Sequence, residues 1–512
     1  MLIAVLRLGV ATLAASAAAI AVSVPASALA QTKSALNLAM VAEPPTLDVQ
    51  STPADLVCII MQHVYETLYT FDAASNLVPM LAEGMPNVSA DGKVYGIALR
   101  KGVKLHSGRE LDAEDVVGSL KRWMEVSPRG KSVGAQVESL AVKGPLAFEI
   151  ALKSAYAPLL AQLAMPSGMA AIMAKESLAQ PLKEFIGTGP YQFKERRPDQ
   201  YVLLTRFDGY AARKEPASGY SGKRVALVDE LRFLPVPNAN TRVEGALAGQ
   251  YHYADLLPIA ALSRLEGAPG KVVPLLTPSF GFPYLVFNTK EGSMSQQAVR
   301  QAVQTGEMLA GGFGDTRSFI AEGNHFPKGT PFYSEAGTAK YNERDAKKAK
   351  AMAEAAGYKG DAVRILTSRQ YDFHYNMALI MAEQLKRAGF KAELNVVDWA
   401  TLLQRRTDPR LWDIYITHSG LFPEPMLSPP QLGDGAPGWW SSPAKTQALA
   451  ALNQEPDPAK RGALWGKVQQ VVYDEVPYIH VGKFASLSSR APSLQGYTPH
   501  TYPFFWNTTL KN

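Results

Sequence analysis

A chain of 512 residues with a single cysteine is too long for one hydrophobic core and cannot form an intrachain disulfide, so we expect two or three lobes held together by apolar packing. The formal net charge of +6 is small and spread along the chain, which excludes the concentrated basic surface typical of nucleic-acid binding. Hydrophobic residues make up 47% of the chain, as in an ordinary globular protein.

Residues 1–30 have the pattern of a cleavable signal peptide. Arg7 is the only charged residue among them, and the apolar run that follows ends in the small-residue sequence Ala28-Leu29-Ala30. An uncleaved membrane anchor is the alternative, since the apolar run is long. The abundance of alanine and the small-residue exit favour cleavage. An exported chain without disulfides fits a bacterial periplasm, so we expect that location.

The first half of the chain contains clear local signals. Residues 35–41 alternate as in a strand and end before two prolines. Asp112 has the properties of a helix N-cap, with Asp115 as its reciprocal partner, and the helix is predicted to run to about Met124. The sequence Gly187-Thr188-Gly189-Pro190 predicts a tight turn in which the backbone is exposed.

The stretch at residues 280–303 predicts a strand that leads into a new helix in mid-chain. Tyr284–Phe287 is a short run of strand-forming residues after Pro283, and apolar residues recur at helical spacing from Ala298. We interpret this stretch as a crossing between two lobes, and we predict a second crossing strand at residues 476–481.

Residues 345–397 repeat a unit made of a helix, a glycine and a strand. The predicted helices at 345–356 and 377–388 stop at Gly357 and Gly389, and strands follow at 362–366 and 392–397. This alternation predicts α/β layers with parallel strand pairing.

Catalytic motifs are missing from the sequence, so we expect no enzyme activity, no metal and no cofactor. Neither a GxSxG elbow nor an HExxH pair occurs. His63 and Glu66 have a spacing compatible with metal binding, but their segment is apolar, which favours a core histidine. A secreted hydrolase that uses a pair of carboxylates stays open as an alternative, because Asp and Glu occur throughout the chain.

Several segments together resemble the peptide/nickel class of extracytoplasmic solute-binding proteins, the receptors of ABC importers. The matching segments occur in the order and at the separations of that class: EPPTLD (43–48), YETLYTFD (65–72), LDAEDVVGSLKR (111–122), GTGPYQF (187–193), RVEGALAGQYHYAD (242–255) and PYLVFNT (283–289). The resemblance implies an α/β, bilobal periplasmic-binding-protein fold of type II, in its large three-subdomain variety, with two hinge-crossing strands.

The resemblance also implies a domain plan and a function. Lobe one would span residues 31–276, with an inserted subdomain at about 77–186; lobe two would span 277–481, and residues 482–512 would return to lobe one. The chain would be a monomer that captures a small peptide-like or other organic solute and delivers it to the permease subunits of the inner membrane, with ATPase subunits behind them. A metal-chelate or haem carrier of the same family is a further alternative.

The resemblance places the ligand site in a cleft, but this sequence lacks the residue that makes one of the usual ligand contacts there. In peptide-binding relatives, an aspartate after a lobe-two strand anchors the α-ammonium group of the ligand. Aligning the Pro-Glu-Pro sequence at 423–425 puts Leu421 at that position and His418 near a family tryptophan. A leucine cannot pair with an ammonium group, so this contact is not expected. Glu43, Glu66 or Glu424 could supply an anion instead, although Glu424 is expected to cap local backbone.

Aromatic residues and their neighbours are the predicted lining of this cleft, since aromatic rings give a large contact area at low entropic cost. Packing in the core remains the alternative for each aromatic residue. The predicted ligand-binding residues are Glu43, Phe280, Phe282, Tyr284, Thr417, His418, Leu421, Phe422, Trp439 and Trp440.

Overall fold

The structure is a computed structural model that describes residues 34–306, 316–369, 372–433 and 435–511. The predicted signal peptide lies outside these residues. No helix within them is both long enough and apolar enough to cross a membrane.

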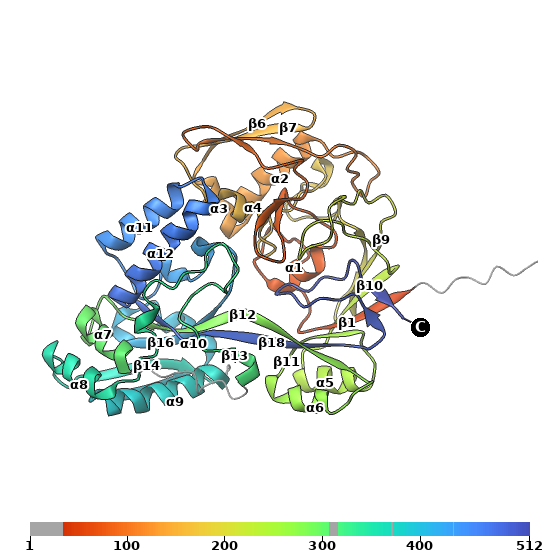
Figure 1. Ribbon diagram of the computed structural model, residues 1–512. Coiled ribbons are helices and arrows are strands. Elements are labelled where there is room, and N and C mark those ends of the chain that lie inside the picture. Colours follow the sequence, from red (N-terminus) through yellow and green to blue (C-terminus); the bar gives the residue numbers. More distant parts are fainter. Residues whose placement is uncertain (1–33, 307–315, 370–371, 434, 512) are drawn as a thin grey trace, which may run out of the picture. The chain divides into compact units, whose positions relative to one another are not determined.

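One large sheet runs through most of the described chain (Figure 1). Its strands lie in the order β15-β14-β16-β12-β18-β11-β1-β10-β9-β8, and β13 and β17 pair with β18 and β12. The bounds are β1 (Ala35–Met40), β8 (Tyr191–Arg197), β9 (Tyr201–Arg206), β10 (Glu230–Pro235), β11 (Tyr253–Leu257), β12 (Val273–Phe287), β13 (Phe319–Ile320), β14 (Ala362–Ser368), β15 (Lys391–Val397), β16 (Ile414–Gly420), β17 (Tyr478–His480) and β18 (Lys483–Arg490).

Hydrophobic core clusters divide the described chain into two parts. Residues 36–272, together with 487–505 near the C-terminus, build three clusters that we call the first part. Residues 282–481 build the other two clusters, which we call the second part. None of the five clusters draws its buried residues from both parts.

Strands β12 and β18 connect the two parts. The beginning of β12 pairs with β18, and its end, from Gly281 to Phe287, pairs with β16. Between Thr277 and Gly281 the register against β18 shifts, and Ser279 has a φ of 52°. The first crossing therefore lies in β12, which contains the predicted strand at 284–287. The second crossing is β18 and not the predicted segment 476–481, because β17 pairs only with the end of β12.

The second part contains the predicted repeat of helix, glycine and strand. Helix α8 (Ala346–Ala355) begins where the Asp345 side chain accepts a hydrogen bond from Lys348 N, and α9 (Asp372–Arg387) precedes β15. Gly357 and Gly389, with φ angles of 79° and 83°, follow these helices. Strand β14 pairs in parallel with both β15 and β16, so the predicted α/β layering is confirmed.

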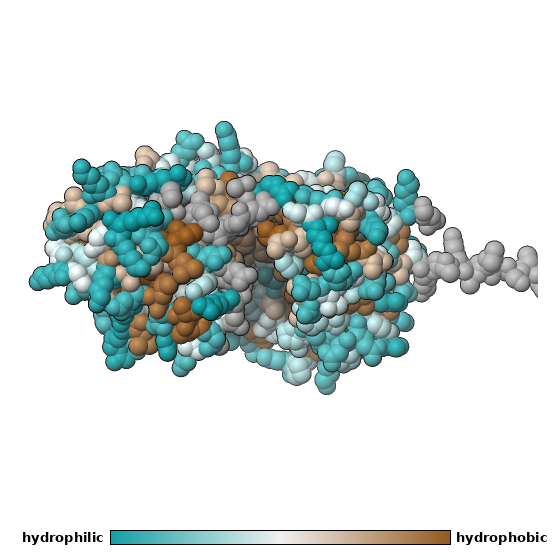
Figure 2. Space-filling model, turned by 90° about the horizontal axis from the view of Figure 1, so that it is seen from below, coloured by the Kyte–Doolittle hydropathy of each residue, from teal (hydrophilic) through white to brown (hydrophobic). Residues whose placement is uncertain are grey.

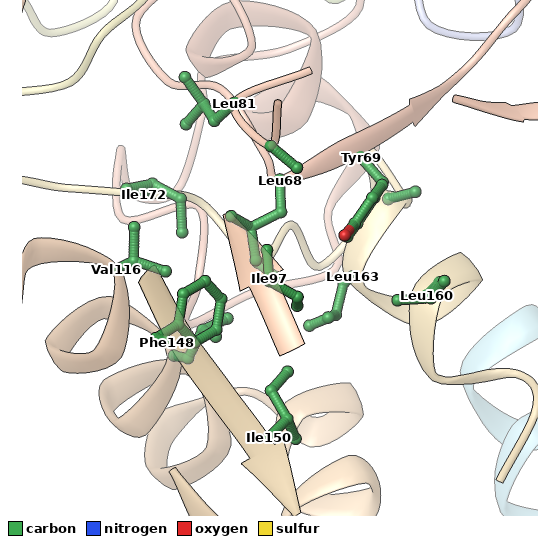
Figure 3. Packing of buried hydrophobic residues seen from close by; sticks show 14 of the residues in the cluster. Leu68, Tyr69, Leu81, Ile97, Val116, Phe148, Ile150, Leu160, Leu163 and Ile172 are labelled. Atoms are coloured by element: carbon green, nitrogen blue, oxygen red, sulfur yellow. The ribbon is translucent and has the colours of Figure 1, made fainter. Parts of the chain in front are cut away.

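A smaller sheet in the order β4-β5-β7-β6 packs with three helices around a core of its own. Figure 3 shows Leu68, Ile97, Phe148 and Ile150 within this core. The predicted capping box is confirmed, since Asp112 accepts from Asp115 N and the Asp115 side chain accepts from Asp112 N. These elements are β4 (Asn87–Val88), β5 (Val94–Ala98), β6 (Val137–Gly144), β7 (Ala147–Leu152), α2 (Ala113–Val126), α3 (Pro128–Gly134) and α4 (Leu159–Ala164).

The remaining helices cover the large sheet, and two short strand pairs complete the fold. The helices are α1 (Asp55–Met61), α5 (Ala239–Leu247), α6 (Leu262–Glu266), α7 (Gln297–Gly306), α10 (Trp399–Arg405), α11 (Pro443–Gln454) and α12 (Pro458–Glu475). The strand pairs are β2 (Tyr69–Phe71) with β3 (Leu77–Pro79), and β19 (Leu494–Gln495) with β20 (Thr509–Leu510).

Figure 2 shows the surface of the molecule from below. Hydrophilic residues cover most of this face, and hydrophobic residues gather on the half that carries α8 and α9. Leu379 of α9 and Leu394 and Val396 of β15 are exposed. Strand β15 is the last strand of the sheet, and the Lys391–Glu393 ion pair places charges on it, which disfavours pairing with a strand of another molecule.

The C-terminal aromatic segment completes the core of the first part. His63 is fully buried; its Nδ1–H donates to Ile60 O, and its Nε2 accepts a hydrogen bond of 2.9 Å from Phe505 N. The ring of Phe505 is buried and stacks on His63. His63 is therefore a core histidine, as predicted. Cys58 is buried in the same cluster.

The predicted turn at residues 187–190 is buried and not exposed as expected, because it lies against the backbone that follows α1. A Cβ atom added to Gly187 would lie 2.2 Å from Val64 O, and one added to Gly189 would lie 2.2 Å from His63 O. Gly189 N also donates to Val64 O. Glycine is required at both positions because two backbone segments are in direct contact there.

We expect the substitution Gly187→Ala to lower the free energy of unfolding by at least about 1–3 kcal/mol, the usual cost of overpacking, because the obstacle is backbone and cannot rotate away. Gly84→Ala is the matched control, since nothing lies within 4 Å of its added Cβ. Urea denaturation measures both variants. Equal stability of the two would contradict this account of the turn.

Acidification should destabilise the protein, because burial lowers the pKa of all eight histidines. For His63 the pKa falls from 6.5 to about 3, so the unfolded chain takes up a proton below pH 6.5 that the folded chain does not. Stability is then fully present above pH 6.5 and decreases towards pH 3, by about 1.4 kcal/mol per pH unit for each such group.

This dependence can be measured by denaturation at pH 7.5, 6.5 and 5.5. We expect His63→Gln to be less stable than the wild type at pH 7.5 and to lose less stability between pH 6.5 and 5.5, since one proton-uptake site is gone. If the stability of the variant changes with pH as much as that of the wild type, His63 does not contribute to the pH dependence.

Candidate functional site

A cleft with a volume of about 490 Å³ lies where β12 crosses between the two parts. The first part contributes the loop after β2, Met165, Pro166, Tyr220 and residues 499–502 near the C-terminus. The second part contributes two loops, at residues 326–330 and 421–423. Residues 277–279 of β12, where its register shifts, complete the lining. The cleft is therefore bounded by both parts and by a strand that joins them.

Leu421 and Phe422 are the predicted site residues that line this cleft. Leu421 N donates to Phe280 O at 3.2 Å, which holds the loop after β16 against β12. Phe422 is partly buried and packs against two core clusters of the first part. The loop thus extends from the second part and contacts the first part across the cleft.

The other predicted aromatic residues pack within the second part and do not line the cleft. Phe282 and Tyr284, with Thr417 on the neighbouring strand, are less than 5% exposed. Phe280 packs on Phe484, and Trp439 stacks on Trp412. The physical reason is that helices cover both faces of this sheet, so side chains on either face are buried.

Trp440 and His418 have partners away from the cleft. Trp440 is buried, and its Nε1–H donates to the carboxylate of Glu475. His418 Nδ1 lies 3.0 Å from His374 Nε2.

Among the described residues, no group of three or more His, Cys, Asp or Glu side chains could hold a metal ion.

The three candidate carboxylates are engaged in contacts within the protein. Glu43 is paired with Arg196, and neither residue lines the cleft. Glu66 is fully buried and accepts a hydrogen bond from Tyr210. Glu424 accepts from Met426 N, as predicted for a residue that caps local backbone, and also binds Arg461.

Charged groups are scarce along the cleft. The carboxylate of Asp72 accepts hydrogen bonds from Ala74 N, Asn76 N and the Asn76 side chain, and so holds its own turn. Lys328 is exposed. Burial lowers the pKa of His500 from 6.5 to about 4, so this side chain is neutral at pH 7. The lining therefore offers mostly apolar, aromatic, hydroxyl and backbone groups, and few charges.

Sequence reasoning missed the cleft loops at residues 71–75, 326–330 and 499–502. The first of them begins in the family-like segment 65–72, so the resemblance contained a signal for it. The second contains Pro327 and Gly329, which mark a loop but do not indicate what that loop faces. The third lies far along the chain from the other two, and only the folded structure brings it to the cleft.

The Glu424–Arg461 pair has consequences for stability. Both side chains are buried, and the two contacts measure 2.7 and 2.8 Å. We expect Arg461→Met to lower the free energy of unfolding by about 3–5 kcal/mol, because the carboxylate would be left buried without its partner. The double variant Glu424→Gln/Arg461→Met should recover most of this loss. Thermal denaturation of the single and double variants checks both expectations, and equal losses would contradict the coupling.

Comparison with known proteins identifies the family. Residues 76–437 match the family described as bacterial extracellular solute-binding proteins, family 5 Middle. The chain is 27% identical to a probable peptide ABC transporter periplasmic-binding protein of Sinorhizobium fredii, over 96% of this chain and 97% of that one. It is 24% identical to an oligopeptide-binding protein of Bacillus subtilis, over 91% and 89% of the two chains.

A solved structure shows the same fold. The dipeptide-binding protein from Pseudoalteromonas, in complex with Met-Leu, is 20% identical, and the match has a TM-score of 0.72 over 93% of this chain and all of that one. The bilobal α/β fold expected from the resemblance is thus confirmed, with the first and second parts as its lobes. The chain belongs to the family 5 bacterial extracellular solute-binding proteins, and it is a periplasmic solute-binding receptor of an ABC importer.

Proposed function

We propose that the cleft at residues 421–423 captures a small, peptide-like solute, which the receptor delivers unchanged to its permease, with ATPase subunits behind it. The protein would act as a monomer after removal of residues 1–30. Its lobes would be residues 31–276, with an inserted subdomain at about 77–186, and residues 277–481, with 482–512 returning to lobe one. The observation that carries the proposal is a cleft bounded by both lobes at the strand that joins them.

The shift of register in β12 supports a hinge at this strand. Residues 277–281 change their pairing with β18 where the chain passes between lobes, and Ser279 has a positive φ. A change of a few dihedral angles there would rotate one lobe against the other and open the cleft. The loop with Phe422 would then leave the first lobe and admit the solute.

The chemistry of the cleft favours a solute that needs no ammonium anchor at position 421. Leu421 lines the cleft, and the nearest acidic residue in sequence, Glu424, is held by Arg461. An unpaired ammonium group buried at this position would be strongly unfavourable. A peptide with a blocked or solvent-exposed amino group fits better, as does another organic solute of similar size.

The test uses trialanine and N-acetyl-trialanine as probes. We expect the N-acetylated peptide to stabilise the wild-type protein at least as well as trialanine does, with an increase in stability of RT ln(1 + [L]/Kd) in thermal denaturation. Leu421→Asp should reverse this preference, because it restores a carboxylate. Leu411→Asp, at an exposed residue outside the cleft, is the control.

Mass spectrometry of molecules released from the purified, denatured protein complements the probes. Recovery of an intact small solute supports the receptor, whereas turnover of either probe would support the hydrolase. If Leu421→Asp leaves both the released molecules and the probe preference unchanged, position 421 does not face the ligand.

A further inference from the structure

A second groove, with a volume of about 840 Å³, lies next to the cleft. Phe71, Ser75, Gly329, Thr330 and Pro423 line both, so the two spaces adjoin each other. On one side lie the small sheet and α4 of the first lobe. On the other side lie residues 331–332 and the beginning of α12, from the second lobe. None of the predicted ligand-binding residues lines the groove.

Apolar side chains dominate this groove. Met85 and Val88 are 51% and 39% exposed, unusual values for large hydrophobic residues. Leu160, at the margin of the core in Figure 3, also faces the groove. Five prolines add further apolar surface, at positions 86, 331, 423, 456 and 458. Apolar surface left in water at such a place is typical of a binding site.

Four polar side chains of the groove already have partners within the protein. Among the described residues that line it, the charged side chains are Glu424 and Arg461, which neutralise each other. Arg461 donates hydrogen bonds from both terminal nitrogens to the Glu424 carboxylate and from its Nε to Leu452 O. Asn76 binds Asp72, and Thr330 Oγ1 donates to Pro327 O. A charged group entering the groove would therefore lose water without gaining an opposite charge.

We propose that this groove is a second compartment of the ligand site, which takes an uncharged, apolar substituent of the same solute molecule. This inference rests on the proposed function and adds the class of the solute: an extended molecule with aliphatic or aromatic groups at one end. The groove adjoins the cleft and shares five lining residues with it, which is the reason to assign the groove to the solute and not to a separate partner.

Closure of the lobes completes this compartment. Its walls belong to different lobes, and Ala157, which lines it, donates its N–H to Asn453 O in α11 at 2.7 Å. An apolar substituent between the walls would lose its contact with water only when they come together. Its burial would then stabilise the closed form, and a shorter solute would lack that contribution.

Substitution of Val88 tests the compartment. The probes are N-acetyl-trialanine and the same peptide extended by two leucines, at its N-terminus in one version and at its C-terminus in another. Calorimetry should show one extended version binding the wild type at least tenfold more tightly than the short probe. Val88→Asp should weaken the extended probe by roughly ten- to hundredfold and leave the short probe within about twofold.

Matched controls separate the groove from general effects. Val142→Asp places the same charge on an exposed valine of the same small sheet, outside the groove, and should behave as the wild type. Ala459→Trp should fill the groove and also abolish the gain from the extension. Ala451→Trp, at an exposed residue of α11 outside the groove, should not.

The outcomes are distinguishable. If the short probe binds and neither extension adds affinity, the second compartment is overturned while the proposed function stands. The same holds if Val88→Asp weakens only delivery to the permease and not probe binding, since the groove then serves a protein partner. If no probe binds and no solute is released from the purified protein, the proposed function fails, and this inference fails with it.

Discussion

Two strands must belong to two lobes at once, and this constraint determines much of the remaining structure. Strands β12 and β18 stay paired with each other, while β18 also pairs with β11 of the first lobe and β12 also pairs with β16 of the second. The pairing survives because the change of register is confined to residues 277–281. The cleft forms where the regular sheet is interrupted, so the place of the binding site follows from the place of the crossing.

The same sheet explains why loops, and not strands, line the cleft. Helices cover both faces of the sheet in the second lobe, and large side chains such as Phe282 and Tyr284 are used for packing. Loops that leave the ends of strands, such as the one with Leu421 and Phe422, extend beyond the sheet and reach the opposite lobe. This division between a rigid sheet and projecting loops gives a site that can vary without changing the fold.

Local signals predicted the fold well, and the site less well, for a physical reason. The capping box at Asp112, the helices that end at Gly357 and Gly389 and the parallel pairing of β14 depend on residues close in sequence. The identity of the second crossing strand depends on which distant strand it pairs with, and there the prediction was wrong. Aromatic residues gave no signal of their own, because a core and a cleft favour the same residue types. Of the predicted ligand-binding residues, Leu421, placed by alignment with the family segment, and Phe422, predicted as an aromatic residue of the cleft, do line it.

The hydrogen bond from Phe505 to His63 bears on the order of events during synthesis. The core around β1 is assembled from residues near the start of the chain, yet Tyr502 and Phe505 are buried within it. A nascent chain therefore cannot complete its first lobe until residues 502–505 have been translated. The first lobe, which begins the described chain, is therefore completed only after the whole second lobe has been synthesised.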